Sequence, residues 1–456
     1  MSEIKEKMID PKKLSIFAVT WPIFLEVLML MLLGNVDVFM LSQYSDEAVA
    51  GVGIANQLLN MSMTMFGFVS AGAAVIIAQY IGAKKIEDAK RVSLVAMISA
   101  LVFGLAVSTG FILFRFPLLR LMRLEEHLIG WAATMVLIVG GFIFIQAILF
   151  TVGSILRSHG FTRDMLIVTV SMNIFNAIGN AVVIFGPFGL PVFGVPGVAV
   201  VTAFSKFLGL TIALYLLNKR IPGIFKSISH QAKFPFHYIK SILKIGVPAA
   251  GENLSFQGYQ LVMISLIGTL GTIALTTKIY HRSINFFIIL FTISIANGAS
   301  IIIGQLMGAK EYDEIYKRCL RYLKYGIIAS IIGPTLLFFF HRPILGLFTN
   351  NEQIFETAII LFFLGIILEP GRAFNIVIIG ALRATGDVKF PVVMGIIFQW
   401  GVGVLFGFIF GIVFGWGLVG IMIAALLDEW IRGIIMLFRW RSRVWQNMSV
   451  VVEEKA

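Results

Sequence analysis

Apolar runs long enough to cross a bilayer recur along the whole chain and limit what it can fold into. Val92–Phe114 and Met165–Gly186 are two of them, and a helix needs roughly 20 apolar residues to cross the hydrocarbon core. Charged residues make up only 13% of the chain, against roughly 25% in a soluble domain. The sequence therefore predicts an all-α membrane protein and excludes an ordinary water-facing surface.

Turn and charge signals divide the apolar runs into twelve predicted spans. These lie near residues 15–42, 48–80, 92–114, 129–156, 165–186, 192–218, 245–271, 273–305, 322–341, 354–382, 388–410 and 412–438. The first run continues to Ser42 without a small-residue cleavage pattern, so it is too long for a signal-peptide core. The single cysteine, Cys319, excludes an intramolecular disulfide.

The basic residues are distributed unevenly between the two sets of loops. If the N-terminus is cytoplasmic, the loops on that side and both tails hold 27 of the 36 Lys and Arg residues, and the opposite loops hold four. This asymmetry predicts that both termini are cytoplasmic, in a bacterial inner membrane. It also accounts for the net charge of +12, so membrane lipid is an expected partner and nucleic acid is not.

An internal repeat relates the two halves of the chain. Trp21–Arg91 aligns with Val247–Lys317 without a gap, at a constant offset of 226 residues. Matched positions within this segment are Pro22 with Pro248, Glu26 with Glu252, and the Gly-Ala-Lys turns at 82–84 and 308–310. Further along, Arg157 matches Arg383. Each copy holds six spans, an even number, so both copies insert with the same orientation.

Parallel repeats of this kind place the substrate pathway between two bundles. The basic stretch before the second copy contains Pro222, Gly223 and Pro235, and it forms the natural linker. The predicted domains are an N-terminal six-helix bundle at 1–218, a cytoplasmic linker at 219–244, a C-terminal six-helix bundle at 245–438 and a cytoplasmic tail at 439–456.

Together these motifs resemble the multidrug and toxic compound extrusion (MATE) family. Pro22 is followed fifteen residues later by Asp37, a Gly-Ala-Lys turn follows the second span, and Leu-Arg-Ala-Thr-Gly-Asp occupies 382–387. The resemblance covers nearly the whole chain and is closer to the DinF-like than to the NorM-like branch. It implies two bundles that form a V-shaped cleft, and export of amphipathic, often cationic drugs in exchange for protons or sodium.

Asp37 is the strongest candidate for coupling, because a charge within the hydrocarbon costs at least roughly 2.5–3.5 kcal/mol. It lies about 22 residues, or roughly 33 Å, into the first span, which places it in the outer half of the membrane. Its repeat mate, Met263, is apolar, so the repeat itself does not require the carboxylate. The resemblance gives Asp37 the coupling role, and an anchoring hydrogen bond is the alternative.

By the same resemblance, the polar companions of Asp37 are Asn176, Asn180 and Thr202. The two amides stand at i and i+4 and share a helix face. Family members often carry Asp where this chain has Asn180, and loss of that acid favours a proton over sodium. Sodium bound by these four residues remains the alternative, and so does a role of the amides in helix packing.

The second half departs from the NorM-like pattern. The resemblance implies acids at two positions of the second half, and this chain has Ser255 and Arg372 there. Glu369 lies three residues before Arg372, which predicts an internal ion pair. Glu252 is matched by Glu26 in the other copy. A shared structural role for this pair of glutamates is therefore as strong a hypothesis as a role in transport.

Two further charged groups lie within predicted spans of the second half. Lys278, His281 and Arg282 follow one another at i, i+3 and i+4, and Asp428 stands at i,i+4 to Arg432. Pairing across the second bundle is expected for both groups. A proton-relay role for His281 is also open, because the reference pKa of histidine lies near neutrality.

Methionines are concentrated on the first two spans. Thioether side chains suit a wall that must adapt to varied ligands, although lipid-facing or packed positions are an equal alternative. The candidates for the substrate cleft are Met29, Met31, Met40, Gln57, Met61 and Met65.

The sequence thus predicts a secondary antiporter that exports amphipathic or cationic compounds in exchange for protons, as a monomer without cofactor, metal or enzymatic activity. No G-x-x-x-x-G-K-[ST] loop occurs, which disfavours a self-contained ATP pump. A flippase for a lipid-linked saccharide would need a strongly basic cleft, and the candidates here are mixed in sign. An intramembrane enzyme would need a cluster such as H-E-x-x-H, whereas the six histidines are scattered singly. A structural scaffold would leave Asp37 unexplained.

Overall fold

The computed structural model describes residue 12 and residues 14–227 and 235–451, apart from the side chains of residues 32–38. Helices dominate, and no residue in these described ranges lies in a strand. Eight of the described helices are long and apolar enough to cross a membrane, or up to nine if a bent pair is one span. The predicted all-α membrane class is therefore confirmed.

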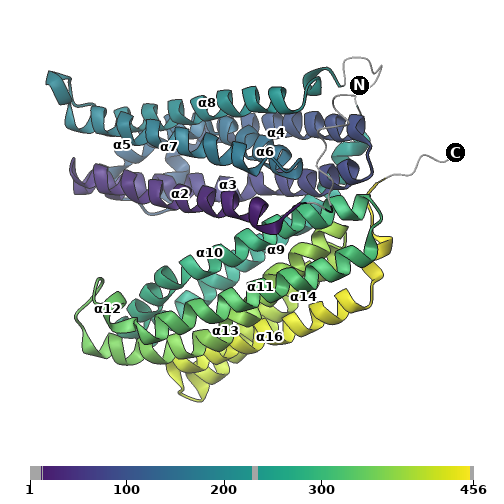
Figure 1. Cartoon of the computed structure of the whole chain (residues 1–456). Helices are drawn as coiled ribbons and strands as arrows, with labels where there is room; N and C mark the ends of the chain where they lie inside the picture. The colour runs from purple at the N-terminus through teal and green to yellow at the C-terminus, as the bar shows by residue number, and fades with distance from the viewer. Residues whose placement is uncertain (1–11, 13, 228–234, 452–456) are drawn as a thin grey trace. The chain divides into compact units, whose positions relative to one another are not determined.

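By packing, the chain divides into two compact units. The N-terminal unit is Trp21–Ile81 with Lys85–Gly246, and the C-terminal unit is Val247–Ala456 with Met1–Thr20 and Gly82–Lys84. The helices of the first half are α2 (Ile16–Ser42), α3 (Asp46–Gly82), α4 (Ile86–Leu121), α5 (Glu126–Met135), α6 (Ile143–Ser158), α7 (Thr162–Phe185) and α8 (Gly194–Arg220) (Figure 1).

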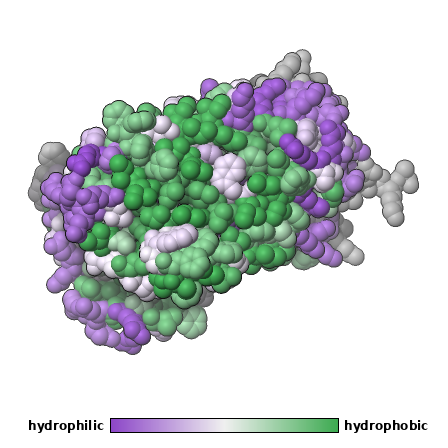
Figure 2. All heavy atoms as spheres, turned by 90° about the horizontal axis from the view of Figure 1, so that it is seen from below, coloured by the Kyte–Doolittle hydropathy of each residue, from purple (hydrophilic) through white to green (hydrophobic). Residues whose placement is uncertain are grey.

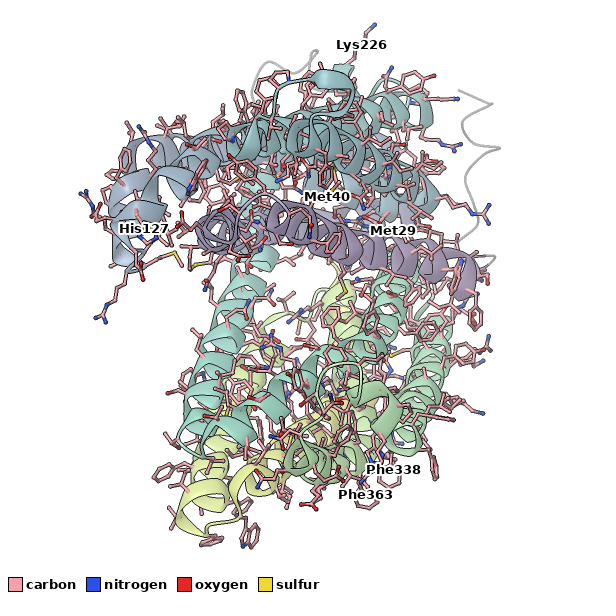
Figure 3. The ribbon with its side chains drawn as sticks, turned by 90° about the vertical axis from the view of Figure 1, so that its left-hand side faces the viewer. Met29, Met40, His127, Lys226, Phe338 and Phe363 are labelled. Carbon is pink, nitrogen blue, oxygen red and sulfur yellow. The ribbon has the colours of Figure 1, made fainter. Side chains whose placement is uncertain are left out.

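The second half repeats this order of spans. Its helices are α9 (Phe236–Gly268), α10 (Thr272–Gly308), α11 (Tyr312–Phe339), α12 (His341–Leu345), α13 (Glu352–Thr385), α14 (Lys389–Phe398), α15 (Leu405–Phe408) and α16 (Gly417–Arg441). Within this unit Phe338 of α11 and Phe363 of α13 lie together (Figure 3), with ring centroids 5.9 Å apart. Each of the twelve predicted spans falls on one helix or one interrupted helix.

Two spans are interrupted where the backbone widens into a π-helical turn. Val136–Gly140 separates α5 from α6, and the two parts are bent by 47°. Gln399–Val404 and Ile409–Val413 flank α15 in the eleventh span. A π-helical turn displaces the regular i→i−4 bonds, so it reorients the side chains that follow it.

The turns after the second span of each copy have the same backbone conformation. Lys84 and Lys310, which are repeat mates, both adopt the left-handed region, with φ of 61° and 59°. A non-glycine residue rarely does so, and it marks the end of a helix here. The repeat detected in the sequence is therefore present in local geometry.

The first span of each copy begins in one unit and continues in the other. The N-terminal unit includes the start of α9, up to Gly246, and the C-terminal unit includes the start of α2, up to Thr20. A Cβ on Gly72 would lie 2.3 Å from the carbonyl oxygen of Ile242, and a Cβ on its mate Gly298 would lie 2.6 Å from Thr20 Oγ1. Glycine at both positions thus permits the same close helix contact.

The surface in Figure 2 carries apolar side chains over its middle and polar side chains toward its ends. Large apolar residues are exposed on individual helices, for example Leu113 at 66% and Phe339 at 71%. A soluble protein rarely leaves such extended apolar patches open to water. The distribution matches helices whose middles contact lipid.

Candidate functional site

A row of buried amides and a hydroxyl joins α7 to α8 in the N-terminal unit. Asn180 Nδ2 donates to Asn176 Oδ1 at 3.1 Å, and Asn176 Nδ2 donates to Thr202 Oγ1 at 3.4 Å. Both amide side chains are at most 2% exposed. The structure therefore brings together three of the residues predicted to form the first-bundle site, and their role in coupling stays a prediction.

Asn173 is a third amide on the same face of α7, and it was not among the predicted site residues. Its Nδ2 donates to the carbonyl oxygen of Met29 at 2.9 Å, which ties α7 to α2. Within the described part of the chain its buried Oδ1 has no partner. The spacing of Asn173, Asn176 and Asn180 at i, i+3 and i+7 is the signal that could have found it.

Asp37 belongs to α2, but its side chain lies outside the described residues. Its level along the bundle follows from the backbone. Asp37 lies eight residues beyond Met29, about 12 Å, and Asn180 lies seven residues beyond Asn173, about 10 Å. The first and fifth spans run in the same direction, so the backbone of Asp37 is at the level of Asn180.

The C-terminal unit contains a row of five alternating charges between α13 and α16. Arg372 contacts Glu369 at 2.6 Å and Glu429 at 3.3 Å. Arg432 contacts Glu429 at 2.8 Å and Asp428 at 3.0 Å. The predicted pairs Glu369–Arg372 and Asp428–Arg432 are therefore confirmed as ion pairs, and Glu429 connects them.

Glu429 was missed, although its i,i+3 spacing to Arg432 was visible in the sequence. Amides support both of the glutamates in the row. Asn285 Nδ2 donates to Glu369 Oε1 at 2.7 Å, and Asn375 Nδ2 donates to Glu429 Oε2 at 2.8 Å. Charges buried within a bundle need such partners, because each one loses its hydration.

Glu252 takes no part in this row. Its carboxylate pairs with Arg383, and its mate Glu26 pairs in the same way with Arg157, at 2.8 Å from Oε1 to Nη1. Both pairs tie the first helix of a copy to the end of its fourth span. This symmetry supports the shared structural role for the two glutamates.

Ser255 stands where the NorM-like pattern has an acid, and its hydroxyl accepts a hydrogen bond from Trp400 Nε1 at 3.0 Å. Arg372, at the other such position, is bound to two carboxylates. The three acids of the charge row therefore lie on α13 and α16, at neither of these two positions.

The expected ion pairing of Lys278 is wrong for the part of the chain that the structure describes. Its Nζ donates to the thioether of Met422 at 3.0 Å, and no described carboxylate lies within ion-pair distance. The thioether is a weak acceptor. His281, one turn further, is buried, and its ring packs against the ring of Phe362 with the centroids 5.2 Å apart.

The candidates for the substrate cleft fall into two groups. Met29, Met31 and Met40 on α2 are half-buried, and two of them are labelled in Figure 3. The second group lies on one exposed face of α3, at i, i+4 and i+8. Its members are Gln57, Met61 and Met65. Contact of either group with a ligand stays a prediction.

His159 lies in the turn after α6 and is half-buried against its own helix. Burial and the nearby Lys90 ammonium lower the pKa of the His159 ring to about 4. Its Nδ1 lies 2.8 Å from the carbonyl oxygen of Ile155. His159 is therefore neutral near neutral pH and is a poor carrier for a proton there. Within the described ranges, no group of three His, Cys, Asp or Glu could hold a metal ion.

A family model, MatE, matches residues 22–182 and 248–409. The two matched segments begin 226 residues apart, the offset of the internal repeat. The chain belongs to the MatE family. As a MATE protein it is a multi-pass membrane protein, and the resemblance found in its sequence is confirmed.

Relatives of this MATE protein cover nearly its whole length. It is 44% identical over 436 residues to the uncharacterized transporter YisQ of Bacillus subtilis, with 95% of each chain covered. It is 28% identical to a probable multidrug resistance protein NorM of Thermotoga maritima, over 99% of this chain and 97% of that one. The first relative is named as a transporter and the second as a multidrug resistance protein.

Solved structures show the same fold. A MATE in the bent conformation has a TM-score of 0.87 at 20% identity, with 97% of each chain covered. An outward-facing multidrug resistance MATE transporter has a TM-score of 0.85 at 21% identity, with 97% of this chain and 98% of that chain covered. The two repeated six-helix bundles predicted for this chain are the architecture of these MATE transporters.

Proposed function

We propose that this MATE protein is a proton-driven antiporter that exports amphipathic, cationic organic compounds, with Asp37 as the carboxylate that exchanges the proton. Both termini would lie in the cytoplasm of a bacterial cell. The observation that carries the proposal is the row Asn173, Asn176, Asn180 and Thr202, which places polar groups inside an apolar bundle at the level of Asp37.

The hydrogen bonds of this row favour a proton over sodium. Asn176 Oδ1 already accepts from Asn180, and Thr202 Oγ1 already accepts from Asn176. Sodium needs several oxygen ligands to replace its water, and two of the row's four side-chain oxygens, those of Asn176 and Thr202, face donors instead. A proton needs one carboxylate whose protonation follows its access to water. Protonation from outside would then favour one state of the bundle and release of the drug.

The test is drug efflux from proteoliposomes under an imposed pH gradient in nominally sodium-free buffer. We expect efflux to follow the pH gradient and to be accompanied by opposite proton movement. Asp37→Asn should insert and fold normally, because loss of a buried charge relieves desolvation, yet it should abolish gradient-driven efflux. The matched control is Asp46→Asn, at an exposed acid at the start of α3, which should keep full activity.

Two outcomes would contradict the proposal in different ways. Efflux that requires millimolar sodium and ignores the pH gradient would assign the row and Asp37 to a sodium site. Full pH-driven efflux by Asp37→Asn would leave antiport intact and move the coupling group elsewhere.

A further inference from the structure

The C-terminal unit holds more positive than negative charge within its helices. The row of five between α13 and α16 contains three acids, Glu369, Asp428 and Glu429, and two arginines. Lys278 and Arg282 of α10 lie beside this row, since Lys278 contacts Met422 of α16 and Asn285 of the same helix donates to Glu369. Four bases therefore meet three acids, and one positive charge is left without a counter-charge in this cluster.

The surplus charge is located on the α10 side of the cluster. Each acid of the row is already bound to an arginine, and Glu369 also accepts from Asn285. Lys278 Nζ donates to the thioether of Met422, and Arg282 is exposed and has no ion pair in the described ranges. At i and i+4 these two side chains share a face of α10.

These cations are not needed for the repeat to fold. The repeat mates of Lys278, Arg282 and Arg372 are Val52, Asn56 and Gln146, none of which is charged. A lysine and an arginine one turn apart on a membrane helix repel each other and cost free energy. A ligand of opposite charge removes both penalties.

We propose that Lys278 and Arg282, with Arg372 behind them, bind a singly charged anion, such as chloride or a carboxylate. The single surplus charge sets the valence of the anion. Lys278 is only half-buried and Arg282 is exposed, so a ligand can reach both donors. This site is separate from the polar row of the N-terminal unit and does not depend on the proposed proton exchange.

The test is equilibrium dialysis of the purified protein against radiolabelled chloride, with sodium sulfate in place of any carboxylate salt to keep the ionic strength constant. We expect saturable binding of about one chloride per chain, in line with one uncompensated charge, and displacement by acetate. Lys278→Met should weaken binding by about tenfold or more, because a charge-assisted contact is lost. Arg282→Gln should weaken it as well, and Lys278→Arg should retain it.

Lys240→Met is the matched control, because Lys240 is an exposed lysine on α9. It should bind chloride as the wild type does. Equal binding by the wild type and by a folded Lys278→Met variant would overturn the proposal, and so would the absence of saturable binding by the wild type. If Lys278→Met fails to fold, unaltered binding by Arg282→Gln overturns it.

A second arm distinguishes the source of the anion. A carboxylate-bearing drug and its methyl ester are compared as competitors of chloride. Displacement by the acid at much lower concentrations than acetate requires assigns the site to the carboxylate of a transported molecule, whereas displacement no stronger than that by acetate assigns it to an anion from solution. Lys278→Met should abolish the competition in the first case.

Discussion

The pair Glu26–Arg157 shows how much one buried contact contributes to this fold. The Glu26 side chain is 8% exposed, and its partner is 24% exposed. Removing one member leaves the other charge partly buried without compensation. We expect Glu26→Ala to lower the free energy of unfolding by about 2 to 4 kcal/mol, measured by thermal unfolding in detergent.

The matched control is Glu126→Ala. Glu126 pairs with Arg120, but its side chain is 75% exposed, and such surface pairs contribute less than about 1 kcal/mol. Glu252→Ala repeats the test in the other copy. A loss for Glu26→Ala no larger than that for Glu126→Ala would show that the symmetric pairs do not hold the first helices.

Two ion pairs of the charge row were predictable from helical spacing in the sequence. Glu369 with Arg372 and Asp428 with Arg432 pair within one helix, where spacing alone brings the side chains together. The contact of Lys278 with α16 depends on the rotation of two separate helices, and no pattern in a single sequence gives that rotation.

At the level of helices, close packing against glycine gives a prediction within α3. A Cβ on Gly72 would lie 2.3 Å from the carbonyl oxygen of Ile242, so Gly72→Ala must push α3 and α9 apart. We expect it to lower the melting temperature. Gly67→Ala on the same helix meets nothing within 4 Å and should be neutral or stabilising, since alanine favours a helix by up to about 1 kcal/mol. Equal shifts for both variants would contradict this packing.

The repeat also preserves geometry where it does not preserve sequence. Arg220 at the end of α8 pairs with Asp164 at 2.7 Å and covers the ring of Phe161. Arg439 in the last turns of α16 pairs with Asp387 at 2.7 Å and covers Phe390. At an offset of 226, Phe161 matches Asp387 and Asp164 matches Phe390, so acid and ring have exchanged places.

An alignment of the two copies therefore does not reveal that the two arrangements are equivalent. In both copies, an arginine at the end of the sixth span pairs with an acid and covers an aromatic ring. The number and order of the spans, by contrast, followed from apolar length and the repeat. The bend of 47° between α5 and α6 did not, because no proline marks the π-helical turn Val136–Gly140, although the pair Gly140-Gly141 at its end is a place where helices can kink.

At the scale of the whole molecule, the orientation in the membrane is the property that loop charge predicts most directly. In a background that lacks Cys319, cysteines are introduced by Ser227→Cys and Gln353→Cys. We expect an impermeant thiol reagent to label them from opposite sides, with Ser227→Cys protected in intact cells. Cys319 is the single cysteine of the chain, so its removal leaves only the introduced thiol to be labelled. Labelling of Ser227→Cys from outside would reverse the orientation.

The division of α2 and α9 between the two units has a consequence for the order in which the chain is synthesised. The N-terminal unit includes residues up to Gly246, and the C-terminal unit includes the start of α2. As the ribosome releases the first half, its packing is still incomplete until the start of α9 emerges. The start of α2 packs against residues such as Gly298, and these are translated much later. Each half is thus finished only by a segment of the other, and neither is a self-sufficient folding product.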